Sequence, residues 1–209
     1  MSRLNNALDV CPLIAILRGL TPNNARAVGQ TLVAAGLSIL EVPINSPQPF
    51  ESICIMRESL ASDVVLGAGT LMTPNDLEQL KQVGGELAIM PHTNPHMIKT
   101  ALDLGLTPMP GVFTPTEAFT AIHAGAQHLK VFPANIAGLG MVKAIKAVLP
   151  NHIKLYAVGG ITASSLKEWS LVEGFGIGGS LFKPNMTLQT IQENASSFHA
   201  AATSWKQHL

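Results

Sequence analysis

Short apolar runs alternate with segments of helical periodicity along the whole chain. Eight of these runs have the length and β-propensity of strands. They cover residues 12–18, 37–43, 64–69, 86–91, 107–111, 128–133, 153–158 and 174–178. The pattern therefore predicts eight strands, each followed by a helical segment.

Several helical segments open with a good N-cap residue followed by proline, a pair that is common at helix starts. These pairs are Thr21-Pro22, Ser46-Pro47, Thr73-Pro74, Asn94-Pro95 and Thr114-Pro115. Short strand-to-helix turns and the lack of any linker favour one α/β domain over residues 1–209, a (β/α)8 TIM barrel near its lower size limit. An open doubly wound sheet is the structural alternative.

Composition agrees with a single packed core. Hydrophobic residues make up 47% of the 209 residues, while aromatic residues make up only 5%, a mixture suited to helices packed on a parallel sheet. Thirteen basic and thirteen acidic residues leave no net charge. With no basic run, a nucleic-acid partner or an anionic membrane surface is not expected, so an anionic ligand must be bound locally.

Location in the cell is predicted from what the sequence lacks. No window reaches the roughly 18 consecutive apolar residues of a membrane span, and the N-terminus does not read as a signal peptide. Cys11 and Cys54 are far apart in apolar settings. They are expected to be reduced, as in a reducing compartment, and the protein is predicted to be cytoplasmic.

Polar residues recur where the predicted strands end. In a parallel barrel the carboxyl ends of the strands form the catalytic face, so these side chains should converge on one mouth. The residues in question are Arg18, Glu41, Thr70, His92 and Lys130.

Lys130 lies within a run, 128–133, that otherwise has the character of a sheet interior. Burial lowers the pKa of a lysine until the neutral amine is a competent nucleophile toward carbonyls, which makes a Schiff base the functional hypothesis. A snorkelling lysine on an edge strand, or half of a structural ion pair, is the alternative.

Glu41 and Arg18 allow two interpretations as well. A carboxylate in an apolar strand suits a general acid and base whose pKa lies near neutrality. An arginine at a strand end suits a bidentate clamp on a carboxylate or phosphate. A structural salt bridge involving these groups would explain both residues equally well.

Glycine pairs follow the last two predicted strands, at 159–160 and 178–179. At this place in barrels, backbone N–H groups commonly hold a phosphate, although a tight turn also explains a Gly-Gly pair. Gly160, Gly178, Gly179 and Ser180 are therefore candidate phosphate ligands. His92 and His96 have a metal-like spacing, but Asn94-Pro95 interrupts it and no third ligand is evident, so no metal is predicted.

Together these motifs resemble the KDPG/KHG aldolase family, in the same order along residues 12–182. The resemblance is carried by Ile14-Ala-Ile-Leu-Arg18-Gly, Leu40-Glu41-Val-Pro-Ile-Asn45-Ser-Pro47, Gly67-Ala-Gly-Thr70, Pro110-Gly111, Thr116-Glu117-Ala118, Ala124-Gly-Ala126, Leu129-Lys130-Val-Phe-Pro133 and Ala157-Val-Gly-Gly160. It implies a class I aldolase, usually a homotrimer, that releases pyruvate and D-glyceraldehyde 3-phosphate from a six-carbon phosphorylated keto-deoxy sugar acid.

The resemblance also implies roles. Lys130 forms the Schiff base and Glu41 moves protons, so no metal or organic cofactor is needed. Arg18 and Thr70 hold the pyruvate end, while the phosphate is held by Gly160, Gly178, Gly179 and Ser180. Val158 and Asn45 match the galactonate type, where gluconate-type relatives carry threonine and arginine.

Two features depart from the galactonate type, and two other functions are alternatives to the aldolase. The turn Gly178-Gly179-Ser180 is closer to the gluconate type, and Pro91-His92-Thr93 replaces a Pro-Asn pair. A phosphosugar isomerase or epimerase would use Glu41 as its base and form no covalent adduct. A non-catalytic phosphosugar-binding protein would keep the anion site without turnover.

Overall fold

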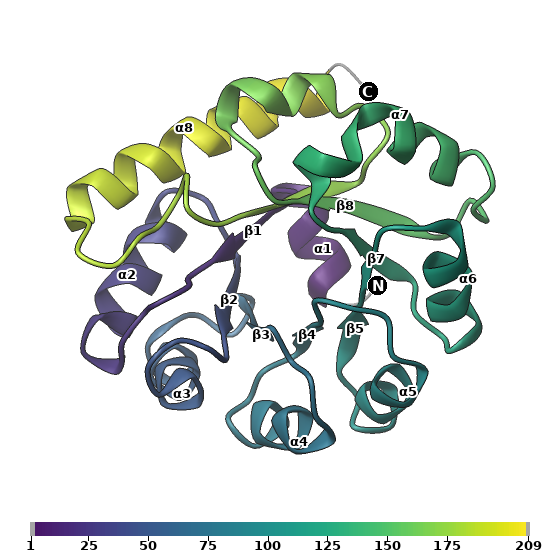
Figure 1. Ribbon diagram of the computed structural model, residues 1–209. Coiled ribbons are helices and arrows are strands. Elements are labelled where there is room, and N and C mark those ends of the chain that lie inside the picture. Colours follow the sequence, from purple (N-terminus) through teal and green to yellow (C-terminus); the bar gives the residue numbers. More distant parts are fainter. Residues whose placement is uncertain (1–2, 208–209) are drawn as a thin grey trace.

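The computed structural model describes residues 3–207 and contains one parallel sheet in the order β5-β4-β3-β2-β1-β9-β8-β7-β6. Its strands are β1 (Leu13–Ile16), β2 (Ile39–Pro43), β3 (Val65–Gly69), β4 (Leu87–Ile89), β5 (Thr107–Met109), β6 (Gly111–Val112), β7 (His128–Val131), β8 (Lys154–Val158) and β9 (Gly174–Ile177). The sheet curls into a ring with helices outside it (Figure 1). The (β/α)8 prediction is confirmed, and the open-sheet alternative is wrong.

Pro110 interrupts the fifth predicted strand, 107–111, and divides it into β5 and β6. Proline has no N–H to give to a ladder, so regular pairing stops there. Pro110 is the only residue between β5 and β6, the two strands at the ends of the sheet order. Its carbonyl accepts a hydrogen bond from the Lys130 N–H at 2.9 Å. The interrupted strand thus closes the barrel.

Side chains of successive strand residues enter two separate cores. One core lies between sheet and outer helices and takes residues such as Leu40 and Leu129. The other fills the barrel lumen and takes their alternating partners, among them Ile39, Val65 and Tyr156. Glu41 is two residues from Ile39, and Lys130 pairs with Tyr156 of β8, so both side chains are directed toward the barrel interior.

The outer layer consists of helices that lie between the strands along the chain or follow the last of them. They are α2 (Pro22–Ala34), α3 (Pro49–Ser59), α4 (Pro74–Gln82), α5 (Pro95–Asp103), α6 (Pro115–His123), α7 (Ala134–Lys146), the 3₁₀ helix η1 (Ala163–Glu168) and α8 (Leu188–Lys206). Four of the predicted cap-and-proline pairs begin a helix at the proline.

The fifth pair, Ser46-Pro47, does not start a helix, and that prediction is wrong. Helix α3 begins at Pro49 with Gln48 as its N-cap. The Ser46 hydroxyl accepts a hydrogen bond from the Gly19 N–H at 2.9 Å instead. It therefore ties the loop after β2 to the loop after β1.

An additional helix, α1 (Arg3–Val10), precedes the first strand and was not predicted. Its buried residues Leu4, Ala7 and Leu8 belong to the lumen core. Figure 1 shows α1 inside the ring of strands. The helix therefore plugs one end of the barrel, and the opposite end is left to hold the cavity.

Helix α8 packs on its own barrel. The indole of Trp205 meets the ring of Phe175 edge-on at 5.0 Å between centroids and donates a hydrogen bond to the Trp169 carbonyl at 3.1 Å. Cys11 is buried and Cys54 half-buried, and both are free thiols. No helix among residues 3–207 is both long and apolar enough to cross a membrane.

Candidate active site

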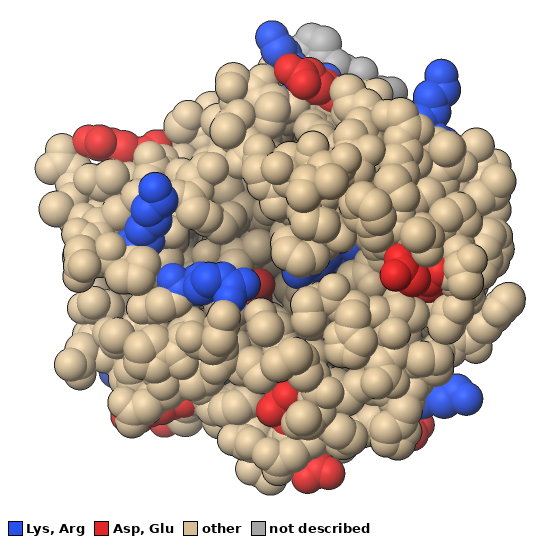
Figure 2. Space-filling view, in the orientation of Figure 1, with Lys and Arg blue, Asp and Glu red and all other residues tan. Residues whose placement is uncertain are grey.

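A cavity of about 170 Å³ lies at the carboxyl ends of the strands. Figure 2 shows a hollow near the middle of one face, where basic and acidic surface meet, on a face that is otherwise largely uncharged. All nine site residues expected from the sequence line the cavity, namely Arg18, Glu41, Thr70, Lys130, Val158, Gly160, Gly178, Gly179 and Ser180. The structure brings these residues together, and their chemical roles remain predictions.

Glu41 reaches the cavity from β2 and is only 2% exposed. Its Oε2 atom has no hydrogen-bond partner in the described chain. Burial raises the pKa of the carboxyl group to about 7, although Lys130, Arg18 and a hydrogen bond from the Gly69 backbone act against this shift. A carboxyl group with that pKa can give or take a proton near neutral pH.

Lys130 reaches the cavity from β7, which pairs with β6 on one side and β8 on the other, so the edge-strand alternative is wrong. The residue is 7% exposed, and its Nζ atom lies 4.4 Å from the ring centroid of Phe132. Burial lowers the pKa of the amine, Arg18 lowers it further, and only the charge of Glu41 raises it. This environment favours the neutral, nucleophilic form.

The alternative of a structural salt bridge at the mouth finds no support in the described side chains. The ion pairs among residues 3–207 join side chains that do not line the cavity. Neither Lys130 nor Arg18 lies within 4 Å of a Glu41 oxygen. Arg18 is exposed and donates from Nη1 to Asn45 Oδ1 at 2.5 Å. Asn45 therefore fixes the direction of a cation at the rim.

Thr70, the first residue after β3, adopts the left-handed region with a φ of 62°. That conformation is unfavourable for a β-branched residue and is typical of functional positions whose surroundings hold the backbone in place. Its presence in the cavity wall agrees with a binding role for Thr70.

The two glycine turns form the opposite part of the wall. Gly160, Ile161, Gly179 and Ser180 lie outside helices and strands, and none of their backbone N–H groups donates a hydrogen bond in the described part of the chain. The Ser180 hydroxyl donates to the Ile161 carbonyl at 3.0 Å and joins the two turns. Unpaired amides from two adjoining turns are suited to an anion.

Neither glycine turn leads directly into a long helix: the first precedes only the six-residue 3₁₀ helix η1. Helix η1 begins at Ala163, and α8 begins only at Leu188. The backbone amides themselves are thus the available anion donors, rather than the first turn of a long helix.

Four further lining residues were not proposed from the sequence as site residues: Ile16, Phe132, Ile161 and Gly176. Strand alternation in the sequence could have identified two of them. Ile16 and Gly176 are each two residues from another inward position of their strand, so strand alternation places them in the same wall. The contact of Phe132 with Lys130 depends on the local turn of the chain after β7.

His92 and His96 are both exposed. Asn94, between them, caps α5 by accepting hydrogen bonds from the His96 and Met97 amides. Within residues 3–207 there is no group of three His, Cys, Asp or Glu side chains that could hold a metal ion.

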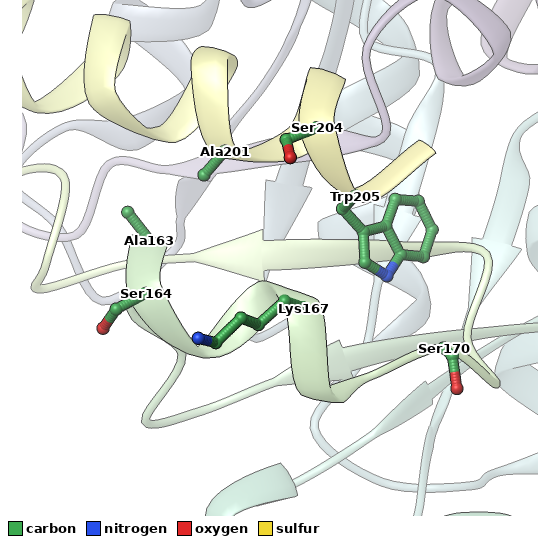
Figure 3. A pocket seen from close by; sticks show the side chains of 7 residues that line it. All are labelled: Ala163, Ser164, Lys167, Ser170, Ala201, Ser204 and Trp205. Carbon is green, nitrogen blue, oxygen red and sulfur yellow. The ribbon is translucent and has the colours of Figure 1, made fainter. Parts of the chain in front are cut away.

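A larger groove of about 450 Å³ lies between η1 and α8 (Figure 3). Its walls are mostly small side chains, with Lys167 as the one charged residue, and they include none of the site residues predicted from the sequence. The smaller cavity is the better candidate because it contains the buried ionisable pair.

The fold and the cavity define a (β/α)8-barrel protein with its candidate site where barrel enzymes carry theirs. The family model for KDPG and KHG aldolase matches residues 4–196. The chain therefore belongs to the KDPG/KHG aldolase family, and its class of activity is that of an aldolase, a carbon–carbon lyase.

Individual relatives agree with this assignment. The chain is 42% identical over 192 residues to a probable 2-dehydro-3-deoxy-6-phosphogalactonate aldolase of Rhizobium meliloti (strain 1021), with 91% of each chain covered. It is 39% identical over 189 residues to 2-dehydro-3-deoxy-6-phosphogalactonate aldolase of Escherichia coli (strain K12), covering 90% of this chain and 92% of the relative. The native KDPGal structure matches with a TM-score of 0.91 at 38% identity, over 94% of this chain and 96% of that one.

Proposed function

We propose that the protein is a class I aldolase that cleaves 2-dehydro-3-deoxy-6-phosphogalactonate to pyruvate and D-glyceraldehyde 3-phosphate. One observation carries the proposal: a buried lysine with a lowered pKa shares a small cavity with a buried glutamate whose pKa is about 7. This is the pairing that Schiff-base chemistry needs, because one group attacks a carbonyl while the other moves protons.

In the first step, the neutral Lys130 amine attacks the C2 carbonyl of the substrate. Glu41 gives a proton to the oxygen, which leaves as water, and an iminium bond joins Lys130 to C2. The carboxylate then takes the proton of the C4 hydroxyl, and the C3–C4 bond breaks so that C4 leaves as the aldehyde of D-glyceraldehyde 3-phosphate. The electron pair of the broken bond moves into the iminium to give an enamine. Protonation of C3 and hydrolysis release pyruvate and restore the amine.

The remaining lining residues hold the two ends of the substrate. Arg18 and Thr70 bind the carboxylate of the pyruvate portion, since the guanidinium offers paired donors at the rim. The amides of Gly160 and Gly179, with Ser180 nearby, bind the terminal phosphate. No metal or organic cofactor takes part, because the iminium itself accepts the electron pair.

Two positions favour the galactonate epimer. Val158 is a cavity residue and Asn45 holds Arg18. Valine cannot make the hydrogen bond to a C4 hydroxyl that threonine makes, so the site lacks a device for selecting the gluconate epimer. The names of the relatives support the same choice. Cleavage of 2-dehydro-3-deoxy-6-phosphogluconate is the alternative within the family, and a phosphosugar isomerase is the alternative outside it.

Two further parts of the proposal concern the protein in the cell. We propose a homotrimer, on the family resemblance, and a cytoplasmic location, on the free thiols of Cys11 and Cys54.

The test is a cleavage assay of the purified protein with each of the two epimeric phosphorylated substrates, in which released pyruvate is measured with and without EDTA. The proposal expects pyruvate from both or from the galactonate epimer alone, a larger kcat/KM for the galactonate epimer, and no effect of the chelator. A larger kcat/KM for the gluconate epimer would overturn the substrate assignment, and loss of activity in EDTA would overturn the metal-free mechanism.

A further inference from the structure

We propose that Gly69 is a positioning residue, and that the missing side chain at this place on β3 creates the slot in which the Glu41 carboxylate lies. The inference rests on the proposed function, since it gives Gly69 its importance through the proton transfers of Glu41. It adds to that function a residue that does not itself touch the reacting atoms.

The geometry of the slot is tight. A Cβ atom added to Gly69 would lie 2.4 Å from Oε2 and 2.6 Å from Oε1 of Glu41, and 2.7 Å from its Cδ. These separations are well inside van der Waals contact, so the carboxylate fills the space that any other residue would occupy. No other carboxylate is held in this way by the glycines of the described chain.

Strand alternation explains why the slot exists. Residues 65, 67 and 69 of β3 share one face, and the first of them, Val65, belongs to the lumen core. At Gly67 and Gly69 that face carries no side chain, beside the strand that carries Glu41. The space left in the lumen is therefore shaped for a side chain from β2.

Glu41 has few other restraints on its position. Its Oε2 atom has no hydrogen-bond partner in the described chain, and no ion pair within 4 Å holds it. Packing against the Gly69 backbone, with the hydrogen bond from that backbone, is what sets the place of the carboxylate. A methyl group at this point would displace the carboxylate from this place.

The same geometry separates a positioning role from a structural one. Gly69 has no positive φ, so alanine fits its backbone conformation. The colliding atoms are the end of a side chain, which can move without disturbing the barrel. At Gly67, by contrast, an added Cβ would lie 2.5 Å from the backbone oxygen of Leu87, and substitution there would disturb the sheet.

The experiment compares Gly69→Ala, Glu41→Asp and the double variant by kcat for cleavage and by thermal unfolding. Gly140→Ala serves as the control, since nothing lies within 4 Å of a Cβ at this exposed helix position. We expect Gly69→Ala to fold and to lose about 100-fold or more in kcat, because a displacement of about 1 Å can cost that much. Gly140→Ala should keep the wild-type kcat.

The double variant distinguishes the proposed role from a general loss of packing. Aspartate is one methylene shorter, so its carboxylate leaves room for the alanine methyl. The double variant should then be at least 10-fold more active than the product of the two single losses predicts. A wild-type kcat for Gly69→Ala, or independent losses that simply multiply, would overturn the inference.

A second readout does not depend on turnover. The Glu41 carboxyl is observed by ¹³C NMR of glutamate-labelled protein, and its signal is assigned by comparison with Glu41→Gln. Its titration midpoint should shift in Gly69→Ala relative to the wild type, and an unchanged midpoint would contradict the inference. If the wild type neither cleaves substrate nor traps pyruvate, the proposed function fails while this titration still tests Gly69.

Discussion

Lys130 and Glu41 project into the cavity from opposite sides of the barrel. Between β7 and β2 lie β8, β9 and β1 in one direction, and the interrupted strand β5/β6, β4 and β3 in the other. The two groups influence the protonation of each other, yet no ion pair joins them. A carbonyl placed between them can therefore be attacked from one wall and receive a proton from the other.

The first prediction concerns the pH dependence of cleavage. Because Glu41, with a pKa of about 7, must be protonated in the free enzyme to give the first proton, kcat/KM should fall as pH rises through an apparent pKa near 7. Since Lys130 titrates in the same environment, this value belongs to the pair. The change in kcat/KM near pH 7 should be absent from the pH profile of Glu41→Gln. If the change persists in that variant, it belongs to another group.

The second prediction concerns stability. The pKa of Glu41 is higher in the folded protein, about 7, than its ordinary value of 4.5. Its contribution to stability is thus fully present below pH 4.5 and is lost as pH rises to about 7. Relative to the wild type, Glu41→Gln should gain up to about 3 kcal/mol between pH 4 and pH 8. Urea unfolding at both pH values measures this gain, and an equal difference at the two pH values would contradict it.

The third prediction tests the phosphate site through Gly179→Ala. The nearest protein atom to an added Cβ is Lys183 Cε at 3.8 Å, so the fold accepts the methyl group. A phosphate bound against the Gly179 amide would not. We expect KM for the phosphorylated substrate to rise at least about 10-fold, a loss of roughly 1.4 kcal/mol, while pyruvate alone reacts normally.

The control for this variant is again Gly140→Ala, which should leave KM unchanged. An unchanged KM in Gly179→Ala would place the phosphate elsewhere in the cavity. Equal losses for the phosphorylated substrate and for pyruvate would point to general damage to the site.

The fourth prediction concerns the hydrogen bond from Arg18 to Asn45. Asn45→Ala frees the guanidinium, and KM for the substrate should rise about 10-fold with little change in kcat, as expected for a hydrogen bond that orients a charged group. Asn45→Asp retains an acceptor and should stay near the wild type. Steady-state kinetics separates the two constants, and an unaltered KM in Asn45→Ala would show that Arg18 needs no such support.

Much of the fold could be predicted because the barrel repeats one local pattern. Alternating strands and helices, with Thr73 or Thr114 at a helix start, are local signals. Because a parallel barrel brings the carboxyl ends of all strands to one face, the positions of Glu41 and Lys130 also predicted that they share one site.

Other features depend on contacts that no local signal reports. Helix α1 has its core residues Leu4, Ala7 and Leu8 at helical spacing, but it lacks a cap signal and packs against strands far along the chain. Ser46 looked like a helix cap and instead bonds to Gly19. The role of Gly69 appears only when the position of the Glu41 carboxylate is known.

The central claim, that Lys130 is the Schiff-base residue, is tested most directly by borohydride reduction in the presence of pyruvate, followed by peptide mass mapping. The measurement uses the wild type and Lys130→Ala. A reduced pyruvyl adduct is expected on Lys130 of the wild type and none on the variant. An unmodified Lys130 at saturating pyruvate would rule out the Schiff base and favour an isomerase or a binding protein.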